Sequence, residues 1–353
     1  MTEGRVKETA LDKRKAFILQ TVVYEYINTA EPVGSVTLTQ KYNLGVSSAT
    51  IRNEMAELEA GGYLVQPHTS SGRVPSDAGY RTYVDELMSP ETLRPEDQQR
   101  IRDGFRAASR DLDEVIDQTT RLLGQLSRSL AFVVAPARST QMFRHVQLIW
   151  LSERTGLAVV VTSLGTPTQS FFELKHDVEA DDLTRLSNVL NGRFGGRLLA
   201  EITRNEIASA VADAGLREDL VTAVEESFAE AADPSDPLIA AAGAQNLLDQ
   251  PEFHDLRKLR SILRIVEEQK RLYELVADSM GQQGTQVRIG HELGTDEIAE
   301  CSLVTVPYRF GEHGAVGLLA ILGPRRMPYG RLMALAGSTA NSLGAHLLDV
   351  ELR

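Results

Sequence analysis

Apolar side chains follow a helical period in the first part of the chain. Ile51, Met55 and Leu58 recur at spacings of four and three residues, so they fall on one face of a helix. The serines at 47–48 can cap the start of this helix, and the glycines at 61–62 can end it, because glycine adopts the left-handed conformation that closes many helices. The pattern therefore predicts an amphipathic helix between these two ends.

The side of this helix opposite the apolar stripe is small and polar. Its members are three alanines and four polar residues: Ala49, Thr50, Arg52, Asn53, Ala56, Glu57 and Ala60. A helix with such a face fits the major groove of DNA, where Arg52 can pair with guanine and Asn53 with adenine. The alternative is that the alanines only favour helix and that Arg52 pairs with a nearby glutamate.

Two further helices are predicted upstream. Residues 37–42 form a short helix that Ser35 can cap, and the turn at 43–46 leads into the helix just described. Two helices joined by a short turn with a glycine are typical of the helix-turn-helix motif. A first helix within residues 12–28 packs over this pair through one apolar stripe, formed by Ile18, Val22 and Tyr26.

A polar hairpin is predicted directly after the third helix. Short strand-like runs at 63–67 and 73–77 flank a tip that contains no acidic residue. This tip offers hydrogen-bond donors to phosphate from His68, Thr69, Ser70, Ser71 and Arg73. Three helices followed by such a hairpin indicate a winged helix-turn-helix, and we expect a DNA-binding domain over residues 1–88.

The remainder of the chain predicts a sheet with helices. Prolines and polar residues indicate a linker at 89–110, and a helix follows at 111–130. Apolar, strand-like runs occur at 131–136, 146–151, 157–163, 170–176, 285–290, 301–308 and 315–323. A last helix is predicted at 329–348.

The strand signal disappears in the middle of this region, which suggests an insertion. We expect an α+β protein in which a sheet domain of residues 111–194 and 283–353 is interrupted by a mainly helical domain at 195–282. Within the insertion, spacings of three and four indicate a buried helical seam that includes the polar Gln269. This seam either joins two chains as a dimerisation surface or packs within one chain; its apolar members are Leu259, Ile262, Val266, Tyr273, Val276 and Met280.

The charge of the chain limits how it can hold DNA. It contains 37 basic and 49 acidic residues, with a net charge of −12, and residues 1–88 alone contain nine basic against eleven acidic residues. With so few cations, each subunit can neutralise only about three to five phosphates. Useful affinity then needs two subunits on two half-sites, so we expect a homodimer on double-stranded DNA.

Patterns of catalytic or metal-binding residues are absent from the sequence. The single Cys301 has no second cysteine for a zinc site, and the seven histidines have no metal-ligand spacing. The acids after His176 are expected at a helix start, and the glycines at 192–196 lack the spacing of a dinucleotide loop. We therefore expect no enzyme activity, cofactor or metal. One cysteine and the lack of a long apolar run predict a cytoplasmic protein.

Three motifs resemble HrcA, the family of heat-inducible transcription repressors of bacteria. They are EPVGS at 31–35, SSATIRNEMAELE at 47–59 and GYLVQPHTSSGRVPSDAGYRTYVDELM at 62–88, and the later segments also follow the order of the family. Ser71 stands where the family usually has alanine. Matched position by position, the resemblance implies DNA contacts at Ser48, Thr50, Arg52, Asn53, His68, Ser70, Gly72 and Arg73.

The resemblance also implies a biological role. It implies a dimeric repressor on an inverted-repeat operator upstream of chaperonin and chaperone operons, with repression relieved on heat shock. It further implies that the chaperonin GroEL keeps the repressor active, and that the sheet domain is GAF-like with an inserted dimerisation domain. Two questions stay open: whether heat acts through chaperonin titration or repressor unfolding, and whether the winged helix is instead an adaptor for protein or structured RNA.

Overall fold

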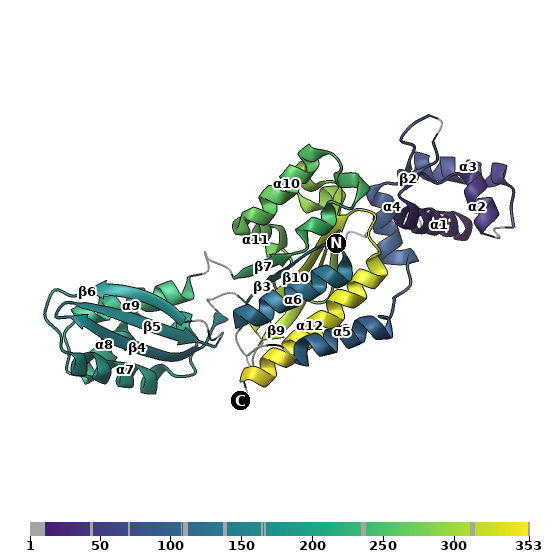
Figure 1. Ribbon diagram of the computed structural model, residues 1–353. Helices are drawn as coiled ribbons and strands as arrows, with labels where there is room; N and C mark the ends of the chain where they lie inside the picture. Colours follow the sequence, from purple (N-terminus) through teal and green to yellow (C-terminus); the bar gives the residue numbers. More distant parts are fainter. Residues whose placement is uncertain are drawn as a thin grey trace, which may run out of the picture.

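The computed structural model describes residues 11–42, 45–69, 71–106, 108, 112–136, 140–163, 165, 167–233, 238–310 and 315–351. These residues form three units arranged in a row (Figure 1). The N-terminal unit lies at one end, a five-stranded sheet with helices on both faces lies in the middle, and a three-stranded sheet with helices lies at the other end. The expectation of a mixed helix and sheet protein is confirmed.

Helices and a short antiparallel hairpin make up the N-terminal unit. Its elements are α1 (Lys13–Thr29), α2 (Ser35–Lys41), α3 (Ser48–Ala60), β1 (Leu64–Val65), β2 (Val74–Pro75) and α4 (Asp77–Thr82), followed by the π-helical turn η1 (Tyr83–Leu87). The Ser47 side chain caps α3 by accepting a hydrogen bond from the Thr50 N–H. The predicted apolar stripe of α3 is fully buried and packs with the stripe of α1, through Ile51, Met55, Leu58, Ile18 and Val22.

The central unit is built on an antiparallel sheet in the order β7-β3-β10-β9-β8. Its strands are β3 (Leu130–Val134), β7 (Ile239–Ala242), β8 (Gln286–Ile289), β9 (Cys301–Phe310) and β10 (Ala315–Pro324). Every residue of β3 is apolar because successive side chains point to opposite faces and both faces are buried. Ala131 and Val133 join the apolar cluster on one face, whereas Leu130, Phe132 and Val134 join the cluster on the other.

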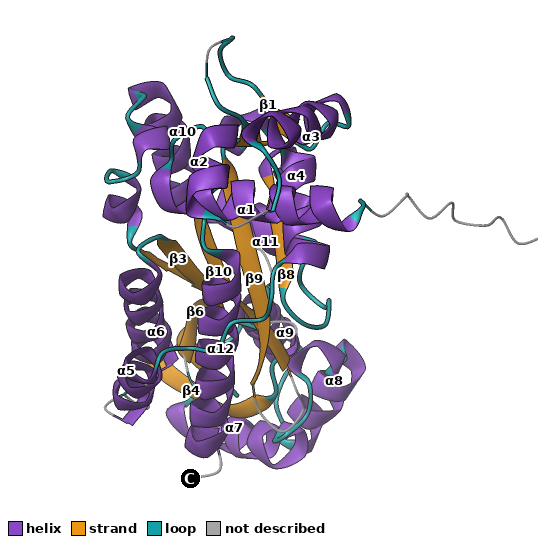
Figure 2. Ribbon diagram, turned by 90° about the vertical axis from the view of Figure 1, so that its right-hand side faces the viewer, coloured by secondary structure: helices purple, strands orange, loops and turns teal. Residues whose placement is uncertain are grey.

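Helices cover both faces of this sheet (Figures 1 and 2). One face packs against α5 (Pro95–Arg106), α6 (Leu112–Ser127) and α12 (Tyr329–Glu351), and this cluster continues into the N-terminal unit. The other face packs against α10 (Leu256–Glu267) and α11 (Gln269–Ala277). Single turns of 3-10 helix complete the unit: η4 (Ala244–Leu247), η5 (Pro251–Phe253), η6 (Gly290–Leu293) and η7 (Asp296–Ile298). None of the described helices has both the length and the apolar composition needed to cross a membrane.

The third unit is inserted between β3 and β7. Its sheet has the order β4-β5-β6, with β4 (Phe143–Ser152), β5 (Thr155–Thr162) and β6 (Pro167–Glu173). One face of the sheet is covered by helices, namely α7 (Ala180–Phe194), η3 (Leu199–Glu201), α8 (Arg204–Asp213) and α9 (Asp219–Ala232). The core between sheet and helices is separate from that of the central unit and contains the packed rings of Phe143, Phe194 and Phe228.

The prediction that all strand-like runs belong to one interrupted sheet is wrong. The runs at 146–151, 157–163 and 170–176 form the separate sheet β4-β5-β6, so the inserted unit comprises residues 143–232 rather than 195–282. The physical reason is that short connections favour pairing between neighbouring strands. Only two residues separate β4 from β5, and these strands pair with each other instead of with β3.

The prediction of a linker at 89–110 is also wrong over part of its length. Pro95 begins α5, and proline is tolerated at the first position of a helix because its missing N–H would be unpaired there anyway. Ile101 is buried, and Asp97 accepts a hydrogen bond from Arg331 of α12 at 3.3 Å. The polar segment is therefore a helix packed on the central unit; residues 107 and 109–111 lie outside the described residues.

The predicted helical seam is divided between two helices. α10 ends at Glu267 and α11 begins at Gln269, because Glu268 between them has an extended backbone with φ −96° and ψ 91°. The seam residues pack within the chain against the second face of the central sheet, not within the inserted unit. Three are buried and three are partly buried in this cluster: Leu259, Ile262 and Val276, and Val266, Tyr273 and Met280.

Candidate nucleic-acid interface

The polar face of α3 is turned to solvent. Its exposed side chains are those of Ala49, Arg52, Asn53, Ala56, Glu57 and Ala60, of which Glu57 pairs with Lys15 of α1 at 2.8 Å. Ser48 and Thr50 are half-buried in the first turn, close to the Ser47 cap. Within the described part of the chain, Arg52 and Asn53 form no hydrogen bond or ion pair, so the alternative pairing of Arg52 with a glutamate is not observed. Both side chains are free to contact another molecule.

Ser71 holds the tip of the hairpin together. Its hydroxyl donates to the His68 carbonyl at 2.7 Å and accepts from the His68 N–H at 3.0 Å. The Gln66 side chain closes the tip from the other side by donating to the carbonyls of Thr69 and Ser71. The serine that replaces the alanine of the family pattern therefore shapes the tip and leaves the exposed His68 ring pointing outward to solvent or a ligand. Ser70 lies outside the described residues.

Gly72 and Arg73 fix the hairpin to the helices. A Cβ on Gly72 would lie 2.5 Å from the Val33 carbonyl, because the backbones at Val33 and Arg73 exchange two hydrogen bonds of 2.9 Å. The Arg73 Nε donates to Glu59 Oε2 at 2.9 Å, and only 15% of the side chain is exposed. Arg73 was expected as a free phosphate donor, but its guanidinium is held against the end of α3.

A cavity of about 430 Å³ lies between α2, α3 and the hairpin. Arg52 lines it from α3, Ser35 from α2, and Gln66 and Ser71 from the hairpin. None of the described residues that line this cavity is acidic. A concave surface with Arg52, the paired Arg73 and several hydroxyl and amide groups is suited to bind a phosphate group.

Several other cations of the N-terminal unit are neutralised within it, whereas Lys13 is exposed and has no ion pair among the described residues. Three pair with glutamates at distances of 2.6 to 3.4 Å: Arg14 with Glu54, Lys15 with Glu57 and Lys41 with Glu25. Hydrogen bonds from Lys41 and Tyr42 lower the pKa of Glu25 below its ordinary value, so this carboxylate stays charged and ties α2 to α1. Among the described residues of this unit, the unpaired positive charges are thus Arg52 on α3 and Lys13 at the start of α1.

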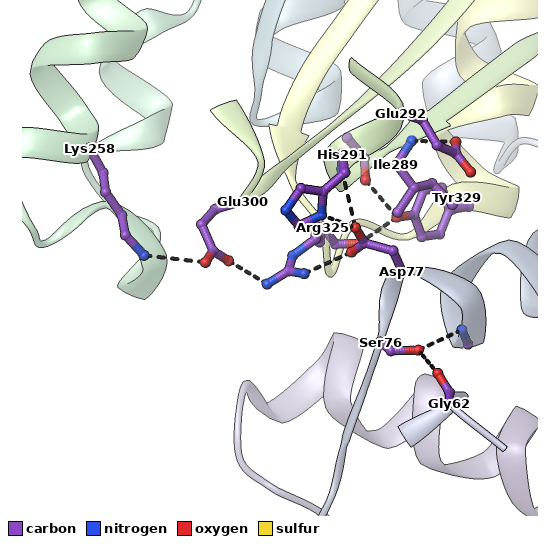
Figure 3. Close-up of polar contacts among 12 residues, drawn as sticks. Gly62, Ser76, Asp77, Lys258, Ile289, His291, Glu292, Glu300, Arg325 and Tyr329 are labelled. Carbon is purple, nitrogen blue, oxygen red and sulfur yellow. Dashed lines mark hydrogen bonds and ion pairs between the residues drawn. The ribbon is translucent and has the colours of Figure 1, made fainter. Parts of the chain in front are cut away.

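A chain of ionic groups joins the N-terminal unit to the central unit (Figure 3). Asp77, at the start of α4, accepts hydrogen bonds from Arg325 Nη1 and His291 Nδ1, each at 2.7 Å. Arg325 also donates to Glu300 at 2.6 Å, and Glu300 pairs with Lys258 of α10 at 3.4 Å. The sequence offered no signal for this contact, because its members are distant along the chain and each is an ordinary polar residue.

Charge at this junction is stabilised by the network. Burial raises the pKa of Asp77, but the hydrogen bonds from Arg325 and His291 together lower it by more. The pKa of Asp77 is therefore below its ordinary value. Arg81, one turn along α4, donates to the Val287 carbonyl at 2.6 Å and pairs with Glu292. The N-terminal unit is therefore attached through α4 to β8 and η6 by charged hydrogen bonds.

The helix-free face of the sheet β4-β5-β6 has an exposed apolar row, next to the polar side chains of Gln147 and Gln169. Ile149 and Phe171 are 39% and 74% exposed, and Leu157 between them is half-buried. The strand register places these three side chains in one row across the sheet. The consecutive apolar residues at 148–151 and 171–172 place apolar side chains on both faces of the sheet, and this sequence signal went unused.

Exposed arginine and asparagine side chains on a helix next to a polar hairpin are typical of DNA-binding transcription regulators. Residues 113–333 match the family model described as HrcA protein C terminal domain. The chain is 37% identical to the heat-inducible transcription repressor HrcA of Pelotomaculum thermopropionicum, covering 94% of this chain and 96% of that protein. It is 39% identical to the HrcA repressor of Desulforudis audaxviator, and this match covers 92% of this chain and 94% of that protein. The chain belongs to the HrcA family of heat-inducible transcription repressors.

A solved structure shares this fold. The crystal structure of a hypothetical protein at 2.2 Å resolution matches with a TM-score of 0.59 and 25% identity, covering 96% of this chain and 98% of that one. The similarity extends over all three units.

Proposed function

We propose that this chain is a dimeric repressor of heat-shock chaperone operons that binds an inverted-repeat operator. The observation that carries the proposal is the polar face of α3, where Arg52 and Asn53 are exposed and have no partner among the described residues. In this proposal, α1 to α3 and the hairpin act as a winged helix-turn-helix with α3 in the major groove. Arg52 reads a guanine, Asn53 an adenine, and an alanine methyl meets a thymine methyl.

The remaining site residues contact the DNA backbone or support the groups that do. Ser48 and Thr50 lie in the first turn of α3, where hydroxyl groups can donate to a phosphate. His68 and Ser70 at the hairpin tip would bind the adjacent backbone, and Gly72 lets the hairpin approach α2 closely. Arg73 acts indirectly, since its bond to Glu59 sets the angle between hairpin and α3.

We assign dimerisation to the open face of the inserted sheet. A second copy is the occupant that fits, because an inverted repeat requires a twofold axis and the row of Ile149, Leu157 and Phe171 offers a continuous apolar surface. Exposed apolar rows of this kind are stabilised when two sheets pack face to face. The seam residues such as Ile262 would support this arrangement only by keeping the central unit folded, since they are buried there.

Regulation follows from family membership. We propose that the central unit is the GAF-like domain of the family and that GroEL maintains the active repressor in the cytoplasm. Heat shock then relieves repression when unfolded proteins occupy the chaperonin. The Asp77 network provides a physical route by which the state of the central unit reaches the DNA-binding unit.

A band-shift assay tests the function. The full-length chain is titrated onto an inverted-repeat duplex from upstream of the host chaperonin operon, and onto a scrambled duplex of equal composition, at two salt concentrations. We expect a clear preference for the repeat at both salt concentrations, with only a modest loss of affinity at the higher one because few phosphates are neutralised. Equal binding to the two duplexes would contradict the repressor and favour an adaptor for protein or structured RNA.

A further inference from the structure

α10 carries a row of exposed arginines in an otherwise acidic protein. Its inner face, with Leu259 and Ile262, is buried against the central sheet. Its outer face exposes Arg257, Arg260 and Arg264, and spacings of three and four residues align these side chains in one stripe. With a net charge of −12 for the whole chain, such a concentration of positive charge is unusual.

Two of these arginines are uncompensated. Arg257 is 91% exposed and pairs with Asp255 at 3.3 Å, and Lys258 on the flank pairs with Glu300. Arg260 and Arg264 are exposed and form no hydrogen bond or ion pair with the residues that the structure describes. Their guanidinium groups therefore face solvent with their full charge and can form bidentate hydrogen bonds with phosphate.

α10 and α3 lie on the same side of the molecule, in neighbouring units. Figures 1 and 2 both place α10, in the central unit, on the side from which the hairpin of the N-terminal unit projects. The ionic chain from Lys258 through Glu300 and Arg325 to Asp77 connects α10 with the start of α4 (Figure 3). A second link joins η5 to α1, because Arg326 binds both Glu252 and the Ile27 carbonyl. The stripe is thus held in a fixed position relative to α3.

We propose that the arginine stripe of α10 is a second DNA-binding surface that contacts phosphates outside the operator half-site. The proposal rests on the proposed repressor function and extends it. A duplex seated on α3 and the hairpin that continues along this side of the molecule runs toward α10, and its backbone carries one negative charge per strand at each base step. The stripe supplies the cations that the N-terminal unit lacks, without reading any base.

Duplex length and salt dependence test the proposal. The wild-type chain and Arg260→Gln/Arg264→Gln are titrated onto a short duplex limited to the inverted repeat, and onto one extended by about one helical turn on each side. On the long duplex, we expect the variant to bind about 10-fold more weakly, with a salt slope lower by about 3 to 4 for a dimer. On the short duplex, the two proteins should bind alike, and the preference for operator over scrambled sequence should not change.

Two further variants serve as controls. Arg260→Lys/Arg264→Lys keeps the charge and should restore most of the affinity, whereas Arg106→Gln/Arg217→Gln removes the same charge from exposed positions on α5 and the α8–α9 loop and should bind like wild type. Equal salt slopes for wild type and the α10 glutamine variant on the long duplex would overturn the proposal. The arginine stripe would then be a candidate binding surface for an acidic protein instead of DNA. Failure of the wild type to prefer operator DNA would instead contradict the repressor function.

Discussion

Arg52 and Arg73 belong to the same surface but differ in what holds them. Arg52 is exposed and has no partner among the described residues, so its removal leaves no polar group of the protein unsatisfied. Arg73 is largely buried, and its removal would leave Glu59 without the hydrogen bonds that it accepts. The two arginines should therefore give different mutational signatures.

For Arg52→Ala, we expect a loss of about 1 to 3 kcal/mol in operator binding and relaxed discrimination at one base position in each half-site. The thermal unfolding of the chain should not change. Titrations against operators substituted at single positions measure the discrimination. Arg73→Ala is the comparison: it should weaken binding to all sequences alike and also lower the stability of the N-terminal unit. If Arg52→Ala binds every operator like wild type, α3 does not read the groove as proposed.

Helical periodicity was sufficient to predict which side chains of α3 face outward, because exposure in a helix depends on local spacing. The bond between Arg73 and Glu59 could not be predicted in this way, since it forms only when the hairpin folds back on the end of α3. The same holds for Ser71, whose hydroxyl bonds to His68 depend on the geometry of the tip. Residue types thus predicted the chemistry of the interface but not its internal support.

At the level of elements, apolar alternation predicts strands but not their partners. β3 pairs with β10 and β7, which are far along the chain, whereas β4 pairs with its neighbour β5. Local patterns contain no information about such long-range choices. The seam in α10 and α11 illustrates the same limit: its spacing predicts a buried face, and the covering surface is the central sheet of the same chain.

The open face of β4-β5-β6 gives a prediction at this scale. Ile149→Asp/Phe171→Asp should yield a folded monomer with weak operator binding, because aspartates on that face would be desolvated and repel each other across the interface. Light scattering after size exclusion measures the mass. Ile262→Asp, by contrast, places a charge at a site that is 1% exposed and should unfold the central unit. A stable dimer of the double variant would show that the subunits meet elsewhere.

At the scale of the whole molecule, ion pairs position the DNA-binding unit. The Asp77–Arg325 and Arg81–Glu292 pairs join residues 248 and 211 positions apart. Gly290 allows this close approach, since a Cβ there would lie 2.3 Å from an Asp77 carboxylate oxygen. Contacts over such separations cannot be derived from one sequence, yet they decide how α3 is oriented relative to the inserted unit and hence, in the proposed dimer, to the second subunit.

This junction should respond to pH in a defined direction. The folded state lowers the pKa of Asp77, so its contribution to stability is complete above the ordinary aspartate pKa and is lost as the pH falls through the lowered value. For Asp77→Asn we expect the free energy of opening of α4 to be lower than in wild type by about 1 to 2 kcal/mol at pH 7. This difference should vanish at acidic pH, where Asp77 of the wild type is itself protonated. Hydrogen exchange of the α4 amides, corrected for intrinsic rates at each pH, measures this opening. Asp117→Asn, which removes an exposed pair within α6, should leave α4 unchanged. A penalty at Asp77 that stays constant down to pH 3 would show that packing, not charge, holds the units together.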